Sequence, residues 1–318
     1  MSLRPPYPLD KMPKLVLDII VENTEADDRM ILRKSCKTFR ELADKKYHYI
    51  KTMAFSKSPD RVDLRITTGD NSELEISYTK DSSDCKVEFM KRDRMGFTIT
   101  PKRTKIITGT GYLTTALSDF ATFINNPKCF VGHLTLSNWQ EETCIVPLMR
   151  TLTSMKTTLS VQKLLLSSKV SENFVLEMLP FFKPGTLKEV VLDVGNHEYG
   201  EILMELDQWK LAKEASVYGH VPISQFLHFN QFSTRVKNLS LEDVKLMTET
   251  AIQRVEEFEG FTVNSNEFAD ISLYLKTMFP IATNKDTSRY RRIGESNLYL
   301  KMFHNQWCIS IEKKVVVK

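Results

Sequence analysis

The feature that most constrains the fold of this chain is an internal repeat in its C-terminal two-thirds. Each copy carries apolar residues at positions i, i+3 and i+5, and the clearest copies span 131–136, 161–166, 187–192 and 236–241. Weaker copies end at Val217 and Val263. The last apolar position of each copy recurs after 30, 26, 25, 24 and 22 residues. This period is close to the ~20–29 residues of a leucine-rich-repeat unit.

Helical patterns fill the segments between these copies, at 147–155, 173–182, 200–213 and 248–257. A unit of one strand and one helix cannot bury its own apolar face, so consecutive units stack with their strands in a parallel sheet. The consensus Asn or Cys of true leucine-rich repeats is absent. We therefore predict a solenoid that is leucine-rich-repeat-like.

The N-terminal third has a different pattern. Residues 9–50 carry apolar residues at helical spacing, with Pro13 where a first helical residue stands. Apolar and polar residues alternate in 61–67 and 74–78, which predicts antiparallel strands. The predicted fold class is α/β mixed, with an α-helical module at 1–53, a small antiparallel β linker region at 54–110 and a leucine-rich-repeat-like α/β solenoid at 111–318.

The composition is that of an ordinary globular protein, with 42% hydrophobic and 26% charged residues. The net charge of +4 is too weak to indicate nucleic acid as a partner by itself. No apolar segment resembles a signal peptide, and none is long enough to span a membrane. Five scattered cysteines without a CxxC pair indicate reduced thiols. We expect a cytoplasmic or nuclear protein, or one found in both compartments.

No motif for catalysis or metal binding is found. Gly109 and Gly111 form a lone Gly-x-Gly without the Lys that follows in a phosphate loop, so a turn is the better interpretation. The six histidines lack metal-ligand spacing, and Asp193 near His197 has no nucleophile beside it. We expect a protein that is not an enzyme and that binds no metal and no cofactor.

A basic stretch at 86–105 holds seven Lys and Arg residues near Phe89 and Phe97, and a second basic cluster lies at 289–292. Basic residues interleaved with aromatics could bind single-stranded RNA. A solvated charged face is the more common origin of such a pattern. We favour the solvated face.

Residues 8–50 resemble an F-box. The resemblance rests on Pro8-Leu9, Met12-Pro13, Leu15-Val16 and Ile19-Ile20, and on the run 31–42. Within that run, Leu-Arg-Lys-x-Cys-x-x-Phe-Arg is similar to the F-box-A subfamily. In this family the helices bind the Skp-class linker of cullin–RING ubiquitin ligases. The resemblance implies linker binding by Leu9, Pro13, Leu15, Val16, Ile19, Ile20, Leu32, Cys36 and Phe39.

Some apolar residues of an F-box must close its helices on each other, and others must stay exposed for the linker. Docking of helices needs exposed apolar anchors at helical spacing. We expect Leu9, Pro13 and Ile20 to be the docking residues. We place four other apolar residues of this set in the interior of the module, namely Leu15, Ile19, Leu32 and Phe39.

The C-terminal part is similar to an FTH domain, the usual companion of that subfamily. The similarity rests on 175–180, 185–190, 208–213 and His228-Phe229, and on 298–303 and 309–311, which are similar to the family's closing strands. It implies that this part binds a partner protein. In a stacked sheet, the positions between the apolar ones line up on the exposed face. We therefore expect target binding by Thr135, Leu165, Val191, Ser216, Ser240 and Thr262.

These two resemblances together imply a substrate-recruiting subunit of an SCF-type ubiquitin ligase. Its partners would be the Skp-class linker, through it the cullin–RING core, and an unknown target protein, with neither membrane nor nucleic acid involved. The alternative is an interaction adaptor in translational or RNP regulation that causes no degradation. An enzyme with an unrecognised site is a third and less favoured class.

Overall fold

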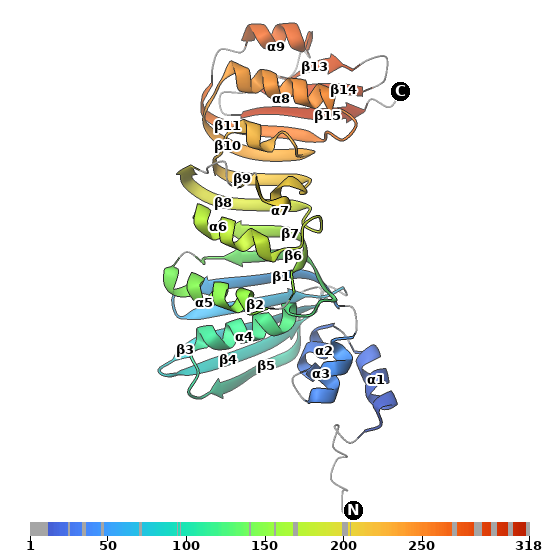
Figure 1. Ribbon diagram of the computed structural model, residues 1–318, viewed down its shortest axis with the longest axis vertical. Helices are drawn as coiled ribbons and strands as arrows, with labels where there is room; N and C mark the ends of the chain where they lie inside the picture. The colour runs from blue at the N-terminus through green and yellow to red at the C-terminus, as the bar shows by residue number, and fades with distance from the viewer. Residues whose placement is uncertain are drawn as a thin grey trace, which may run out of the picture. The chain divides into compact units, whose positions relative to one another are not determined.

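Figure 1 presents a computed structural model of the chain. The structure describes residues 12–24, 26–33, 36–45, 48–69, 72–93, 95, 97–139, 141–155, 157–167, 171–198, 203, 205–268, 272–282, 288–293, 298–304 and 308–315. The chain divides into two compact units. Residues 1–165 and 181–186 form the N-terminal unit, and residues 166–180 and 187–318 form the C-terminal unit.

The N-terminal unit begins with short helices and continues into a sheet. Its helices are α1 (Lys14–Glu22), α2 (Ala26–Arg33), α3 (Lys37–Ala43), α4 (Tyr112–Ile124) and α5 (Glu142–Thr153). Its strands are β1 (His48–Ser58), β2 (Arg61–Thr67), β3 (Glu73–Asp81), β4 (Asp84–Arg92), β5 (Thr98–Ile107), β6 (Cys129–Ser137) and most of β7 (Ser160–Ser167).

The sheet of the N-terminal unit has the strand order β7-β6-β1-β2-β3-β4-β5. Strand β1 is antiparallel to β2 and parallel to β6, whereas β2, β3, β4 and β5 form an antiparallel meander. Side chains alternate strictly in β2, where Val62, Leu64 and Ile66 are buried. Period-2 alternation of this kind buries one face of a sheet, and α4 packs on β2 and β3 at that face (Figure 1).

Aromatic side chains fill the space between α4 and this sheet. The ring of Phe55 in β1 stacks on Phe120 of α4 with centroids 4.5 Å apart, and it contacts Trp139 at 4.8 Å. The Trp139 indole donates a hydrogen bond to the Phe55 carbonyl oxygen over 2.9 Å. The hydroxyl of buried Tyr78 donates to Asp119 on α4 over 2.8 Å, so the polar end of that ring is satisfied.

The C-terminal unit is built mainly of strands. These are β8 (Glu189–Glu198), β9 (Glu214–His220), β10 (Gln231–Leu239), β11 (Gly260–Phe268), β12 (Ile281–Ala282), β13 (Ser288–Arg292), β14 (Leu298–His304) and β15 (Cys308–Val315). Its helices are α6 (Glu172–Met178), α7 (Asp207–Lys210), α8 (Leu241–Gln253) and α9 (Ser272–Met278), and short 3-10 turns are η2 (Leu179–Phe181), at the boundary of the units, and η4 (Ile223–Phe226).

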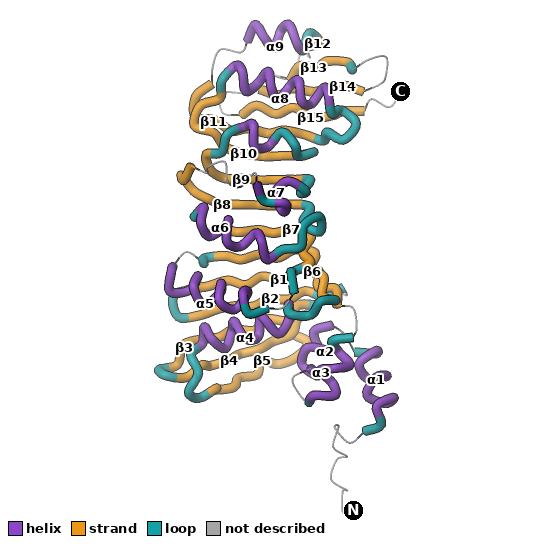
Figure 2. Tube along the Cα trace, viewed as in Figure 1, coloured by secondary structure: helices purple, strands orange, loops and turns teal. Residues whose placement is uncertain are grey.

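The sheet of the C-terminal unit has the order β12-β13-β14-β15-β11-β10-β9-β8. Strands β8 to β11 are parallel neighbours, and β15, β14, β13 and β12 continue antiparallel from β11. Figure 2 shows helices α7 and α8 against one face of these strands. An aromatic cluster is buried there, with ring centroids 4.3–5.1 Å apart in the pairs Trp209–Phe229, Phe226–Phe232, Phe232–Phe261 and Phe258–Phe261.

The predicted fold class is wrong. The C-terminal part is β-rich rather than a leucine-rich-repeat-like α/β solenoid, because antiparallel strands β15, β14 and β13 extend its parallel strands into a mixed sheet. The predicted antiparallel strands near residues 61–67 and 74–78 are present as β2 and β3. They are not a separate small sheet, since β1 is hydrogen-bonded to both β2 and β6. The domain boundaries at 53 and 110 stay predictions.

The repeat copy at 236–241 is out of register with the structure. Strand β10 ends at Leu239, and Ser240 is the N-cap of α8. The Ser240 hydroxyl accepts a hydrogen bond from the Asp243 amide, and the Asp243 carboxylate accepts one from the Ser240 amide, each over 3.1 Å. This capping box satisfies amides that the helix itself leaves unpaired. Ser240 and Leu241 therefore begin a helix instead of ending a strand.

We predict that Gly132→Ala destabilises the N-terminal unit by about 1–3 kcal/mol. A Cβ atom at this position of β6 would lie 2.7 Å from the Lys51 carbonyl oxygen and 3.1 Å from the Tyr49 hydroxyl. The first neighbour is backbone of a paired strand and cannot move aside. Chemical denaturation of both proteins measures the change.

The matched control is Gly260→Ala in β11, where the nearest atom would be the Ile311 carbonyl oxygen at 3.5 Å. That distance is ordinary van der Waals contact, so this variant should be as stable as the wild type or slightly more so. Equal effects of the two substitutions would contradict the steric explanation.

Candidate protein-interaction sites

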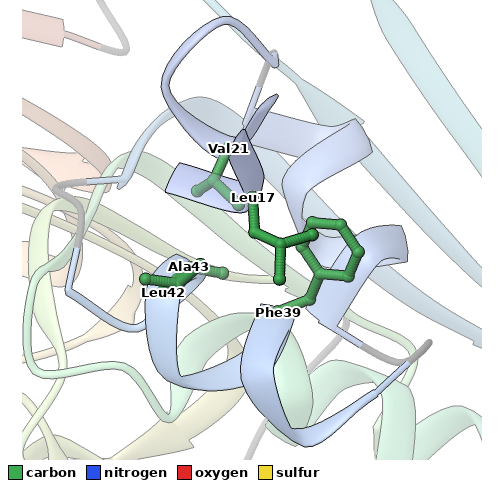
Figure 3. Packing of buried hydrophobic residues seen from close by; sticks show 5 residues of the cluster. All are labelled: Leu17, Val21, Phe39, Leu42 and Ala43. Atoms are coloured by element: carbon green, nitrogen blue, oxygen red, sulfur yellow. The ribbon is translucent and has the colours of Figure 1, made fainter. Parts of the chain in front are cut away.

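Helices α1, α2 and α3 close on a small apolar core of their own (Figure 3). The side chains of Leu17, Val21, Phe39, Leu42 and Ala43 point toward one another and are at most 3% exposed. Partly buried apolar residues pack around them, namely Met12, Ile20, Leu32 and Cys36. Helices of 7–9 residues are too short to be stable alone in water, so this shared core holds them.

Helix α1 is apolar on more of its circumference than this core can cover. Leu15 is 73% exposed, Ile19 50% and Val16 40%. At about 100° per residue these side chains occupy one arc of the helix, and Ile20, Leu17 and Val21 occupy the adjoining arc. We call Leu15, Val16 and Ile19 the exposed arc. An apolar patch on a helix surface is typical of a site that docks another protein.

The structure changes the assignment of individual residues within this module. Leu15 and Ile19 were placed in the interior, which is wrong, since both lie on the exposed arc. Ile20, expected to dock, packs partly buried against the core. Leu32 and Phe39 lie in or against the core as expected, and Pro13 is exposed. Leu9 lies outside the described residues. Whether any of these residues binds the linker stays a prediction.

Polar contacts join these helices to one another and to the sheet of the same unit. Arg33 of α2 pairs with Asp44 at the end of α3 over 2.6 Å, and Lys91 of β4 reaches Asp28 of α2 over 3.5 Å. His48, the first residue of β1, is 1% exposed, and its Nε2 lies 2.8 Å from the Ala43 carbonyl oxygen at the end of α3. Burial lowers the pKa of His48, with a smaller contribution from nearby Arg29. The neutral ring therefore donates this hydrogen bond.

In the C-terminal unit, small side chains form a row across the strands on the face turned away from α7 and α8. The register pairs Val191 with Ser216, Ser216 with Ser233, and Ser233 with Thr262. Thr262 in turn is paired with Ser310, and their hydroxyl oxygens are 3.3 Å apart. We call Val191, Ser216, Ser233, Thr262 and Ser310 the outer row. Their sequence neighbours in the strands, such as Val217 and Val263, are buried on the helix side.

The outer row unites only part of the predicted target-binding set. Val191, Ser216 and Thr262 belong to it, whereas Ser240 is the helix N-cap described above. Thr135 of β6 and Leu165 of β7 lie in the N-terminal unit. Sequence reasoning missed Ser233, because the repeat copy in β10 was shifted toward the start of α8. The alternating burial of β10, with Phe232 and Thr234 buried, would have given the correct register.

The basic stretch at 86–105 is largely an ion-paired surface. Lys86 and Lys102 contact Glu88 over 2.8 and 2.9 Å, and Arg92 contacts Glu75 over 3.5 Å. Arg103 and Lys105 are exposed on β5. Arg94 lies outside the described residues.

Nothing in the described part of the chain gathers into a metal site of three or more His, Cys, Asp or Glu residues. Gly109 lies in a turn with φ +70°, where its amide donates to Asp84 over 3.0 Å, and this confirms the turn interpretation. His133 contacts the Thr135 hydroxyl, and His228 contacts the Trp209 carbonyl oxygen. None of the described helices is long and apolar enough to cross a membrane.

Comparison with known protein families assigns two segments of the chain. The F-box domain family matches residues 9–51, which makes α1, α2 and α3 a module of the kind that binds Skp-class proteins in SCF complexes. The FTH domain family matches residues 142–276. The chain therefore belongs to the F-box proteins that carry a C-terminal FTH domain. No match is found among curated proteins or among solved structures.

We predict that acid weakens the contact between the F-box and the sheet. The pKa of folded His48 lies below the ordinary value of 6.5, so the unfolded chain binds a proton more readily. The contribution of the neutral His48 ring to the free energy of unfolding is then fully present above pH ~6.5. It is lost as the pH falls through the lowered pKa of the folded state. Thermal unfolding midpoints between about pH 7.5 and 5 measure the slope.

His48→Gln is the informative variant, because an amide can donate to the Ala43 carbonyl oxygen without titrating. Its unfolding midpoint should depend less on pH than that of the wild type. Parallel curves for the two proteins would contradict the role of His48. The pKa of His228 is also lowered by burial, so some pH dependence from the C-terminal unit remains in both proteins.

Proposed function

We propose that this chain is the substrate-recruiting subunit of an SCF-type ubiquitin ligase. The exposed arc of α1 would dock onto the Skp-class linker, and the outer row of the FTH part would hold the target protein. The observation that carries the proposal is the exposure of Leu15, Val16 and Ile19 on a helix that lies within the F-box match.

The exposed arc is suited to docking on energetic grounds. Fully burying a Leu, Ile or Val side chain contributes about 1.5–3 kcal/mol, and the arc offers such side chains at spacings of one, three and four residues along one helix. The core residues Leu17 and Val21 already hold α1 in place, so docking requires no refolding. A preformed helix loses less entropy on binding than a segment that must first fold.

The mechanism of such a subunit is proximity. A target held on the same chain as the linker-binding helices is present at a high effective concentration beside the ligase core. No group of this chain has to take part in the chemistry of ubiquitin transfer. F-box and FTH domains are interaction modules, which agrees with this role.

The outer row supports the second half of the proposal. Ser216, Ser233 and Thr262 are small and partly exposed, and together with Val191 they leave a low surface along which the side chains of a partner can lie. Ser310, at the end of the row, is buried. Hydroxyl groups donate and accept hydrogen bonds, so such a surface can pair with the polar groups of a protein backbone or side chain.

We predict that Leu15→Asp combined with Ile19→Asp weakens binding of the Skp-class linker by about 100-fold or more. Each substitution places a charge where an apolar contact is expected, and both side chains are exposed, so the fold should be preserved. Isothermal titration with the purified linker measures the loss, and circular dichroism checks the fold.

Leu273→Asp on α9 is the matched control, since Leu273 is 78% exposed, close to the 73% of Leu15. It should leave linker affinity unchanged. If the double variant is folded and still binds the linker as tightly as the wild type, the exposed arc is not the docking site.

We predict that Ser216→Arg and Ser233→Arg reduce target capture while linker binding is unaffected. A long, positively charged side chain in the outer row would keep the target protein from contacting the neighbouring strands. Ser240→Ala is the control, since it should cost only about 1 kcal/mol of stability through loss of the helix cap. Crosslinking with quantitative mass spectrometry, compared among these variants, measures capture. Equal capture by all of them would rule the outer row out.

A further inference from the structure

A third surface lies on β2, β3, β4 and β5, outside both family matches. It occupies the face of these strands turned away from α4. Opposed charges alternate across it: Arg65 is paired in register with Glu75, and Asp63 and Glu88 both flank Ser77. We call the following set the charged layer: Arg61, Asp63, Arg65, Glu75, Lys86, Glu88, Arg92 and Lys102.

The cations of the charged layer converge on its carboxylates. Arg65 and Arg92 contact Glu75 over 3.3 and 3.5 Å, and Lys86 and Lys102 contact Glu88 over 2.8 and 2.9 Å. The remaining cation, Arg61, contacts Asp63 over 2.7 Å and the Ser77 hydroxyl over 2.9 Å. Hydrogen bonds from Lys86 and Lys102 lower the pKa of Glu88, which keeps that carboxylate ionised.

The two kinds of charge lie at different depths. The side chains of Glu75, Glu88 and Asp63 are 13%, 15% and 18% exposed. Those of the cations are 40–58% exposed, from Arg92 at 40% to Lys102 at 58%. The carboxylates thus form a floor, and the guanidinium and ammonium groups stand above it. Within this described set, five cations stand above three carboxylates, so an approaching partner meets positive charge first.

This arrangement prepares the cations for a ligand. A free Arg or Lys side chain loses about 2 kcal/mol of rotamer entropy when it is fixed. Here the partly buried carboxylates already hold the cations, so less of that cost falls on binding. A guanidinium has five N–H donors, more than a contact with one carboxylate uses. The exposed donors can therefore bind a second carboxylate from a partner.

The centre of the charged layer contains a cavity of about 200 Å³. Arg61, Arg92 and Lys102 supply cations to its wall, and Met90 supplies an apolar side chain. This combination favours a peptide that carries carboxylates together with an apolar side chain. A phosphate backbone would use the cations and leave the apolar side chain of Met90 uncovered.

The partner is expected on the face of the sheet, not at its edge. Strand β5 ends the order of described strands in this unit, and it carries Pro101 with Lys102, Arg103 and Lys105. Proline lacks an amide donor, and charged side chains on an edge strand oppose the addition of another strand. Addition of a peptide strand at this edge is therefore disfavoured.

We propose that the charged layer of strands β2 to β5 is a binding site for an acidic, partly apolar segment of a partner protein. The site is independent of the linker surface and of the outer row, because it uses none of their residues. It gives the chain a recognition surface in the region between its F-box and FTH matches.

The test compares Lys102→Glu with Lys105→Glu in the full-length chain. Both substitutions reverse the same charge on the same strand. Lys102 contacts Glu88 in the charged layer, whereas Lys105 is paired with buried Val87 and lies on the opposite face. The probe is a short fluorescent peptide that alternates Glu and Leu, and fluorescence anisotropy measures its affinity. Thermal unfolding confirms that both variants are folded.

The proposal predicts that the wild type binds this peptide, that Lys102→Glu weakens binding by about tenfold or more, and that Lys105→Glu changes it by less than about twofold. A peptide alternating Lys and Leu should not bind. Failure of the wild type to bind the acidic peptide, or equal losses in the two variants, would overturn it. Tighter binding of single-stranded polyuridine than of the peptide, with the same dependence on Lys102, would assign the layer to RNA instead.

Discussion

The N-terminal unit depends on the pairing of β1 with strands on both sides. Strand β1 is antiparallel to β2, its immediate successor, and parallel to β6, which begins only at Cys129. Parallel neighbours need a long connection, and here that connection contains β2 to β5 and helix α4. The same strand starts at His48, whose ring is hydrogen-bonded to the last residue of α3. One strand thus organises the sheet and anchors the F-box helices to it.

The positions of the strands could be predicted from the sequence more reliably than the order in which the strands pair. Alternation in Arg61–Thr67 correctly predicted β2, because one face of that strand is buried and the other is charged. The repeat correctly located parallel strands near 187–192 and 215–217. It could not reveal that β15 pairs with β11 from the far end of the chain, since pairing over long sequence separation leaves no periodic signal. The solenoid prediction failed for that reason.

The candidate sites were predictable in kind but not residue by residue. Helix α1 is apolar at six of its nine positions, so spacing alone could not decide whether the arc of Leu15 and Ile19 or that of Leu17 and Val21 faces inward. The arc of Leu17 and Val21 faces inward because it packs against Phe39 on α3, and this is a tertiary contact that spacing within α1 does not reveal. The charged layer was visible only as a basic stretch. The carboxylates that convert it into paired charges come largely from β2 and β3, strands earlier in the sequence.

In both the F-box and the charged layer, the groups that hold the structure differ from those that face outward. Removing Phe39 from the shared core would cost about 3–5 kcal/mol, a large fraction of the stability of a domain, whereas changes at exposed Leu15 stay within about 0.5 kcal/mol. In the charged layer, Glu75 and Glu88 hold the cations that stand above them. Because the two roles fall on different side chains, the outward-facing residues of either surface can change without loss of the fold. This separation allows the chain to keep the core of its F-box while the exposed side chains change.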